Sequence, residues 1–349
     1  MRFHRAQAGD PREPHGRARV RREGRRDRLP RRRGPSRPRV HVHHDERRAP
    51  FGGARGRRDR GACIPARARL VAREDAGQAR RRAGREDRAH RPASRREAHV
   101  AHHEIHPEAM RALAYWTSAM LDRARMHPDD AERRRAQALV DLLIPVVKGW
   151  STEMGIEVAS LGIQVHGGMG FIEETGAAQH LRDARITTIY EGTTGIQAND
   201  LVGRKMGREE GRTALALIAE MEKTVPQLAA SSEAPLRAIG ESLRVALDCL
   251  RTTVAWVSKT FASQPAAVAA ASVYVLKLMG ITLGGWMLAR SAQIASEQLA
   301  EGEGDAAFLK GKILTARFFA EHVMAQATSL SAAATRGAES VLAMEEALL

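Results

Sequence analysis

Residues 164–197 read QVHGGMGFIEETGAAQHLRDARITTIYEGTTGIQ, and this stretch decides how the rest of the chain is interpreted. It predicts a short charged helix flanked by two glycine-bearing turns, at 167–170 and 191–195. Turns of this kind expose backbone N–H groups, and the first amides of a helix have no internal partner, so they can hold a phosphate or pyrophosphate. Glu191 lies between Tyr190 and Gly192, where a carboxylate can reach a substrate.

Three motifs in this stretch carry a family resemblance. They are Q-x-x-G-G-x-G-F, L-R-D-A-R and I-Y-E-G-T-x-x-I-Q, in the order and spacing of the C-terminal helical domain of the acyl-CoA dehydrogenase family, which the chain resembles from about Met110 onward. Beyond Gly207, the run FLKGKILTARFFAEH resembles the extra C-terminal domain of a larger subgroup that includes the methylthiopropionyl-CoA dehydrogenases. The N-terminal third does not resemble the family.

The resemblance implies FAD-dependent dehydrogenation of an acyl-CoA thioester to the trans-2-enoyl-CoA. Glu191 matches the catalytic base, which removes the proton alpha to the thioester while hydride leaves the beta carbon for the flavin. A carboxylate suits that task where burial raises its pKa toward neutrality. Gly192 matches the position whose amide lies beside the bound acyl thioester, the predicted substrate contact.

The resemblance also implies two groups of cofactor contacts. Thr193, Thr194 and Gly195 match a flavin-binding turn. A second stretch matches the part of the family that reaches the ADP portion of FAD, usually on a neighbouring subunit: Gln164, Val165, His166, Gly167 and Gly168. From the pattern alone, the same residues also fit ordinary helix caps, and Glu191 fits a capping glutamate. We expect a packing role for His166 and no metal site.

The charged helix between the turns has its own predicted role. Arg182, Asp183 and Arg185 are expected to form a salt-bridged face that positions the loop carrying Glu191.

The first third of the chain differs in composition from the rest. Residues 1–105 hold 32 Arg, no Lys and 13 acidic residues, a formal charge of +19, while the whole chain carries +15, so the remainder is mildly acidic. With few large apolar residues and no helical or strand period, we expect residues 1–106 to be disordered. A basic arm for nucleic acid, a solvated tail and an out-of-frame translation all fit this composition, and we favour the last.

The remainder predicts an all-α, antiparallel helical bundle, with a family domain at 107–206 and a helical extension at 207–349. Helices are expected from Pro107, from about Asp130 with Asp129 as its N-cap and a bend or restart at Pro145, and at 196–206, 213–224, 236–261, 266–289 and 305–324. The helix at 213–224 is expected to stop at Pro226, and Leu236, Ile239 and Leu243 are expected on one side of the helix at 236–261. The apolar segment 266–289 is long enough for a membrane span. Lys277, Gly280, Gly284 and Gly285 favour a buried helix with close neighbours instead.

Location and partners follow from the same observations. Cys63 and Cys249 give no disulfide framework, and the N-terminus has no apolar leader, so we expect a cytoplasmic protein. The resemblance implies a role in fatty acid metabolism. The resemblance implies an acyl-CoA substrate, an electron-transfer flavoprotein as acceptor and a homo-oligomer, without membrane or nucleic acid. Because the family's N-terminal and β-barrel domains are not legible, we expect an inactive, colourless chain. The alternative is a non-catalytic helical oligomerisation module.

Overall fold

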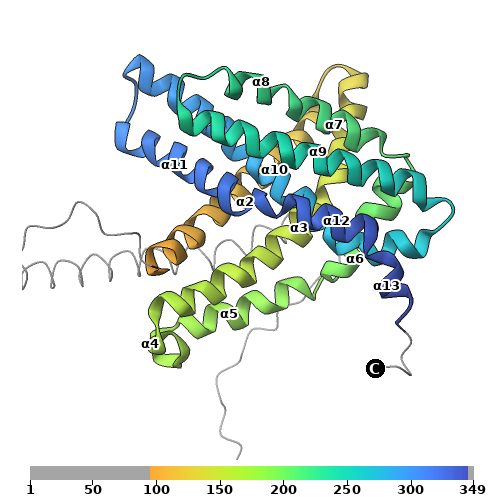
Figure 1. Cartoon of the computed structure of the whole chain (residues 1–349), viewed down its shortest axis with the longest axis horizontal. Helices are drawn as coiled ribbons and strands as arrows, with labels where there is room; N and C mark the ends of the chain where they lie inside the picture. Colours follow the sequence, from red (N-terminus) through yellow and green to blue (C-terminus); the bar gives the residue numbers. More distant parts are fainter. Residues whose placement is uncertain (1–94, 345–349) are drawn as a thin grey trace, which may run out of the picture. The chain divides into compact units, whose positions relative to one another are not determined.

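The structure, a computed structural model, describes the backbone of residues 95–344 and the side chains of residues 104–344 (Figure 1). All regular elements within that range are helical, which confirms the all-α prediction. The longer helices are α2 (Arg95–Met126), α3 (Asp130–His166), α9 (Ala234–Phe261), α10 (Pro265–Glu301) and α11 (Ala306–His322). The shorter elements are α4 (Gly168–Phe171), η2 (Glu173–Thr175), α5 (Ala177–Arg185), η3 (Ile186–Thr188), α6 (Thr194–Asp200), η4 (Leu201–Gly207), α7 (Arg212–Glu222), α8 (Thr224–Ala229), η5 (Met324–Gln326), α12 (Ala327–Arg336) and α13 (Ala338–Leu342).

Helix α2 begins earlier than the sequence predicted. It starts at Arg95, with Pro107 in its interior, so the predicted start at Pro107 is wrong and residues 95–106, assigned above to the disordered segment, are helical. Proline removes one backbone donor from a helix, but the buried side chains of Ile105, Ala109 and Met110 hold both flanks of Pro107 in the core. The expectation of disorder for residues 1–94 lies outside the described residues.

Helix α3 follows α2 after a three-residue connection. Asp129 caps it as predicted, because its carboxylate accepts a hydrogen bond from the Ala131 N–H at 2.9 Å. The helix does not restart at Pro145, which is buried within it. α2 and α3 therefore form a helical hairpin whose two helices pack against each other.

Two other predicted helix ends move. Pro226 does not end a helix but lies inside α8, in the first turn, where a missing N–H costs little. Helix α10 continues to Glu301, twelve residues past the predicted end at Ala289, and stops at Gly302 in the left-handed conformation. The helix expected at 196–206 begins at Thr194, and its second half, η4, is a π-helix.

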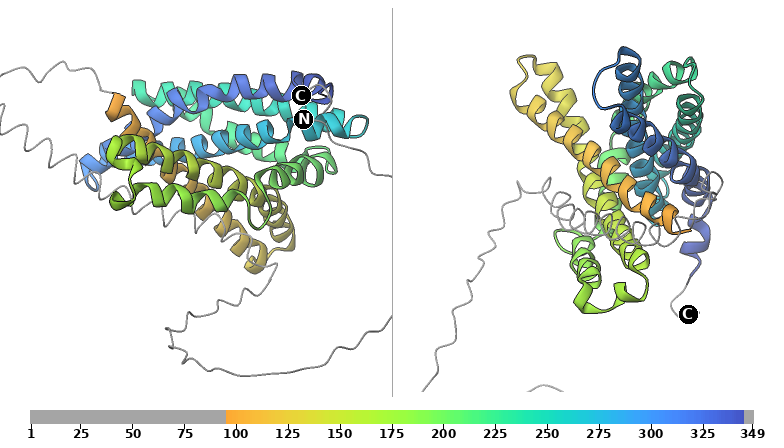
Figure 2. Two further views of the ribbon diagram at one scale, coloured as in Figure 1. Left: turned by 90° about the horizontal axis from the view of Figure 1, so that it is seen from below. Right: turned by 90° about the vertical axis from the view of Figure 1, so that its left-hand side faces the viewer.

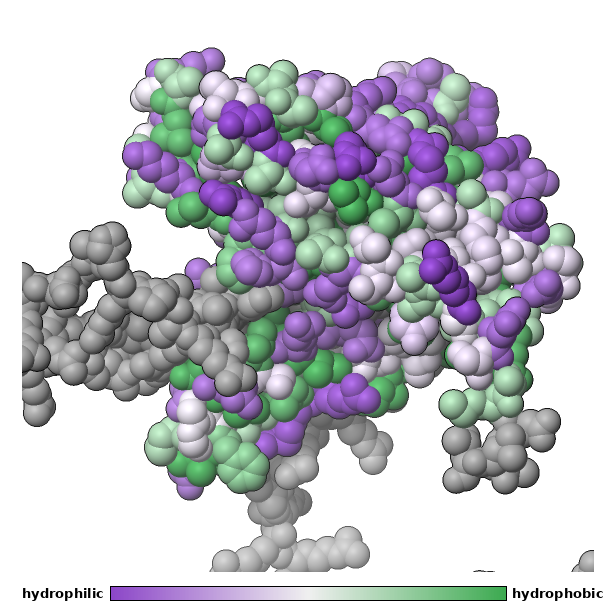
Figure 3. Space-filling model, in the orientation of Figure 1, coloured by the Kyte–Doolittle hydropathy of each residue, from purple (hydrophilic) through white to green (hydrophobic). Residues whose placement is uncertain are grey.

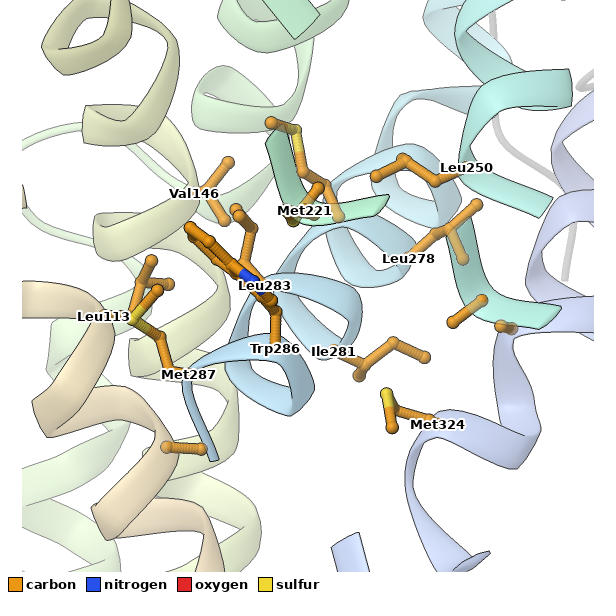
Figure 4. Close-up of a cluster of buried hydrophobic side chains, with 14 of the residues drawn as sticks. Leu113, Val146, Met221, Leu250, Leu278, Ile281, Leu283, Trp286, Met287 and Met324 are labelled. Carbon is orange, nitrogen blue, oxygen red and sulfur yellow. The ribbon is translucent and has the colours of Figure 1, made fainter. Parts of the chain in front are cut away.

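Helix α10 is the centre of the core. It contacts α2, α3 and α6 on one side and α9, α11 and α12 on the other. Figure 4 shows Trp286 and Leu283 of α10 beside Leu113 and Val146 of the α2–α3 hairpin, with Met324 near Ile281. One hydrophobic cluster therefore includes residues from both sides of position 207, and the domain division there stays a prediction.

Glycines on α10 let this helix approach its neighbours closely. A Cβ on Gly280 would overlap the buried ring of Trp150, and one on Gly284 would lie 2.7 Å from the same ring. Gly285 faces Met324 in the same way. Within the described residues α10 is the one helix long and apolar enough to cross a membrane, but 67% of its most apolar window is buried inside the protein. The expectation of close helix neighbours is confirmed.

Helix α5 returns along the C-terminal part of α3, so α3, α4 and α5 form a second hairpin (Figure 2). The two glycine-bearing turns of the sequence lie at its two ends. One turn connects α3 to α4, and the other follows η3 and precedes α6.

We expect Gly280→Ala to lower the free energy of unfolding by about 1–3 kcal/mol, because its Cβ must displace the fully buried Trp150 ring. Chemical denaturation measures this. Gly311→Ala is the matched control, since Gly311 is also helical but has no atom within 4 Å of a Cβ. That change should stabilise the chain by about 0.5–1 kcal/mol. Equal effects of the two substitutions would contradict the close packing of α10 on Trp150.

Candidate active site

The turn that carries Glu191 has an uncommon backbone. Glu191 has φ 55° and Gly192 has φ 92°, two successive residues in the left-handed region. Glycine adopts this region freely, but a glutamate there carries strain. At Gly192, φ 92° is a conformation that side chains rarely adopt, and a Cβ there would also lie 2.8 Å from the Gln197 side-chain nitrogen, so glycine is favoured. The turn therefore needs an outside interaction to hold it.

That interaction comes from Lys148, a buried lysine of α3 that is only 4% exposed. Its Nζ donates to the carbonyl oxygens of Thr187 at 2.8 Å, Tyr190 at 3.0 Å and Gly192 at 2.9 Å. The same nitrogen lies 5.5 Å from the centre of the Tyr190 ring. Three backbone carbonyls of one turn thus converge on a single amine.

Burial lowers the pKa of Lys148 from its ordinary value, because desolvation disfavours the charged amine. The carboxylates of Glu191 and Glu153 act in the opposite direction without cancelling this effect. Sequence analysis did not select Lys148. The available signal was one charged residue within the otherwise apolar run LLIPVVKGW at 142–150.

The Glu191 carboxylate itself is exposed in this chain. The expectation that the Glu191 carboxylate is buried is therefore not met by residues 104–344 alone. Its backbone carbonyl accepts a long hydrogen bond from Gln197, at 3.5 Å. The chain supplies the placement of this carboxylate, and any cover over it must come from elsewhere.

Helix α6 begins directly after the turn. Thr193 is its N-cap, because its hydroxyl accepts from the Ile196 N–H at 3.3 Å. The hydroxyl of Thr194 donates to Glu153 of α3. The backbone amides of Thr194 and Gly195, at the first turn of the helix, have no partner within the helix. The capping interpretation of Thr193 is thus realised, and it leaves the predicted flavin role open.

The residues Gln164, Val165, His166, Gly167 and Gly168 form the end of α3 and the start of α4. Val165 is buried, and His166 is half-buried and donates from Nδ1 to the Gly162 carbonyl at 2.7 Å, a packing role as expected. Gly167, with φ 63°, caps α3 through its N–H to the Gln164 carbonyl. A Cβ on Gly167 or Gly168 would meet nothing within 4 Å, so the backbone here is open to a ligand.

The structure does not bring the two groups of predicted cofactor residues together. They lie at opposite ends of α5, whose nine residues span about 13 Å (Figure 1). A group the size of a phosphate cannot contact both ends. Only an extended dinucleotide, or two copies of the chain, could use both turns.

The charged face of α5 does not position the Glu191 loop as predicted. Arg182 pairs with Glu173 of η2 at 3.4 Å, toward the other end of the hairpin, and Asp183 accepts from Gln179. Exposed ion pairs of this kind contribute little. Lys148 contacts the loop from inside the fold, and we assign to it the positioning of the Glu191 loop that the sequence predicted for the charged face of α5.

Within residues 104–344, no group of three or more His, Cys, Asp or Glu side chains could hold a metal ion.

Two family descriptions match the chain. "Acyl-CoA dehydrogenase, C-terminal domain" matches residues 58–206, and "Acetyl-CoA dehydrogenase C-terminal like" matches residues 217–345. The first match begins upstream of the boundary predicted at residue 107. The two matches include both turns of the candidate site and most of the core.

Curated relatives agree with these matches. The chain is 45% identical over 235 residues to the 3-methylmercaptopropionyl-CoA dehydrogenase of Ruegeria pomeroyi. The matched region is 67% of this chain and 40% of that protein. It is 32% identical over 237 residues to a broad-specificity linear acyl-CoA dehydrogenase of Mycobacterium tuberculosis, covering 65% of this chain and 38% of the relative. The chain thus spans well under half of the length of these relatives.

Solved structures share the fold. Caenorhabditis elegans ACDH-11 in complex with C11-CoA superposes with a TM-score of 0.57 at 18% identity, over 78% of this chain and 43% of that one. An acyl-CoA dehydrogenase of Bacillus anthracis complexed with FAD gives 0.58 at 17% identity, over 86% of this chain and 50% of that one.

The lowered pKa of Lys148 has a measurable consequence. The unfolded chain binds this proton more tightly than the folded chain, so the lysine makes the free energy of unfolding rise with pH between its folded pKa and its ordinary value of 10.5. Lys148→Met lacks this contribution. We expect the free energy of unfolding of the wild type, relative to that of Lys148→Met, to increase as the pH is raised toward 10.5. Denaturation across this range measures it, and Lys310→Met, at an exposed position, controls for general loss of charge. A relative free energy that stays flat or falls would contradict the assignment.

Proposed function

Because the chain belongs, by its two C-terminal domains, to the acyl-CoA dehydrogenase family, we propose that Glu191 is the base in FAD-dependent dehydrogenation of an acyl-CoA thioester. The observation that carries this proposal is the turn at 190–192, which presents the Glu191 carboxylate from a strained backbone anchored to α3. Strained residues held by the surrounding fold are common at active sites.

The reaction assigns a single task to Glu191. Its carboxylate takes the proton from the carbon alpha to the thioester, and the two electrons of that C–H bond form the new double bond as hydride leaves the beta carbon. A base must lie within hydrogen-bond reach of the proton that it removes. In the proposed complex, the amide of Gly192, in the same turn, would lie beside the thioester of the acyl-CoA.

FAD, when bound, would accept the hydride. The residues present fit such a group in two places. The first-turn amides of Thr194 and Gly195 can hold an oxygen of the flavin portion, and the open backbone of Gly167 and Gly168 can lie against the ADP portion. The Thr194 hydroxyl already donates to Glu153, so its backbone, rather than its side chain, is the donor offered to the cofactor.

The placement of the two turns at opposite ends of α5 supports a homo-oligomer in which a second copy contributes the Gln164–Gly168 segment to the FAD site. Apolar side chains around this hairpin lack cover, and Figure 3 shows hydrophobic groups on this part of the surface. The exposed fractions are 58% for Met169, 80% for Phe171, 53% for Ile186 and 49% for Ile189. Exposed clusters of this kind mark interaction surfaces.

The remaining parts of the proposal rest on the family. The named relatives act on different acyl groups, so the proposed substrate is an acyl-CoA as a class. An electron-transfer flavoprotein as acceptor, a cytoplasmic location and a role in fatty acid metabolism complete it. The alternative, a non-catalytic oligomerisation module, is favoured by the exposure of Glu191 and by the short span of the chain relative to its relatives.

A hybrid enzyme separates the two functions. The 235 matched residues of the Ruegeria pomeroyi relative are replaced with those of this chain, and enoyl-CoA formation is measured with an artificial electron acceptor. We expect activity in the hybrid and a loss of about 100-fold or more in kcat on Glu191→Gln, the range typical of a lost general base.

Glu210→Gln is the matched control, because Glu210 is also an exposed glutamate with positive φ, 53°. It should leave turnover within about twofold, since surface substitutions away from a site have small effects. Undiminished turnover of the Glu191→Gln hybrid would remove Glu191 from the mechanism. A folded, flavin-containing but inactive hybrid would favour the oligomerisation module.

Self-association has a separate test. Phe171→Glu places a charge in the exposed apolar group on the α3–α5 hairpin and should weaken association of the full chain by about tenfold or more, measured by sedimentation. Phe308→Glu on α11, where Phe308 is 60% exposed, is the control. Equal effects of the two changes would argue against this hairpin as the contact surface.

A further inference from the structure

We propose that Lys148 is a positioning residue for the Glu191 turn: its amine clamps the carbonyls of Tyr190 and Gly192, on both sides of Glu191, and so holds Glu191 and Gly192 in their left-handed conformation. The clamp is a claim about geometry. It rests on the proposed function only where it makes Glu191 the catalytic base.

The geometry restricts the turn at both ends. The Tyr190 carbonyl belongs to the peptide plane that precedes Glu191, and the Gly192 carbonyl to the plane that follows Gly192. Both accept from Lys148 Nζ, at 3.0 and 2.9 Å. Between these two planes only the backbone dihedrals of Glu191 and Gly192 are free to change. Fixing both planes therefore restrains the backbone of Glu191 and the direction in which its side chain leaves the chain.

The amine has no donor left for another task. An ammonium carries three N–H groups, and the carbonyls of Thr187, Tyr190 and Gly192 use all three. Lys148 therefore forms no direct salt bridge with the Glu191 carboxylate, and at 4% exposure it does not reach a substrate. Its contribution is to hold backbone.

The base of the clamp is itself rigid. Two residues after Lys148, Trp150 is buried against the glycines of α10. The intervening Gly149 is equally close to its neighbours, since a Cβ there would lie 2.7 Å from Leu276 and 3.3 Å from Gln197. Helix α3 is thus held against α10 and α6 at this point, and Lys148 transmits that fixed position to the turn.

Before the left-handed residues, the N–H groups of Ile189 and Tyr190 donate to the Ile186 carbonyl at 3.0 and 3.1 Å. The Gln197 side chain reaches the Glu191 carbonyl only at 3.5 Å. The Thr194–Glu153 hydrogen bond anchors the first turn of α6, after the left-handed residues. Losing the lysine donors should therefore free residues 187–192 locally while the helices stay folded.

Hydrogen exchange of the full chain, without flavin or substrate, tests this directly. With Lys148→Met, which keeps the aliphatic stem, exchange of the amides at 187–192 should rise by about tenfold or more, while α9 and α10 stay within about twofold. Lys312→Met is the control, since Lys312 is a helical lysine ion-paired with Glu108 at 2.8 Å. Exchange at 187–192 that changes by less than twofold in the Lys148 variant would overturn the clamp.

A second measurement isolates the backbone. Glu191→Gly and Glu191→Ala both remove the carboxylate, so the difference between their melting temperatures reports the left-handed conformation alone. With Lys148 present, the glycine variant should melt a few degrees higher. With Lys148→Met added to both, this difference should fall by more than half. An unchanged difference would show that Lys148 does not hold the conformation.

If Lys148→Met fails to fold, chemical modification of the wild-type chain still tests the clamp. Brief acetylation with acetic anhydride, followed by peptide mass analysis, should modify Lys148 at least about tenfold more slowly than the exposed Lys310, because a buried amine must first be released by local opening. Equal rates would overturn the clamp. None of these measurements requires catalysis, so a failed clamp and a failed Glu191 assignment give different results.

Discussion

The convergence of three backbone carbonyls on the Lys148 amine is the interaction on which the candidate site depends. A buried ammonium is costly unless its donors are satisfied, and here every acceptor comes from one short turn. The cost of burial is visible in the lowered pKa of Lys148. These hydrogen bonds define the backbone conformation at Glu191, in a loop that makes few other contacts. The fold thus uses a polar interaction inside the core to place a carboxylate at the surface.

Lys148 can hold the turn only because α3 is itself held. The glycines of α10 allow the Trp150 ring to lie directly on that helix, and no side chain could occupy the same space. α10 in turn contacts helices from both halves of the sequence, so the C-terminal extension stabilises the region that carries Glu191. These contacts give a physical reason why the two matched domains share one core. The extension lies behind the site and supports its scaffold.

Local patterns predicted the helices well where packing and pattern agree. The stripe of Leu236, Ile239 and Leu243 predicted the buried face of α9, and Asp129 predicted the start of α3. Prolines were misleading. Pro107 and Pro145 lie inside long helices because burial of their neighbours outweighs one lost hydrogen bond, a balance that propensity alone does not contain. The glycines of α10 were interpreted correctly, since small residues on an apolar helix indicate a close neighbour.

By itself the sequence determined the helical class and the positions of both turns, because glycine spacing and apolar periodicity are local properties of the chain. Glu191 became the candidate base through the resemblance of the surrounding motif to a family. Tertiary structure alone decided which groups act on that carboxylate. Lys148 is more than forty positions before Glu191 in the sequence, and no local rule connects a lysine in an apolar run to the carbonyls of a distant turn. Only the packing of α3 against α5, α6 and α10 brings them within hydrogen-bond distance.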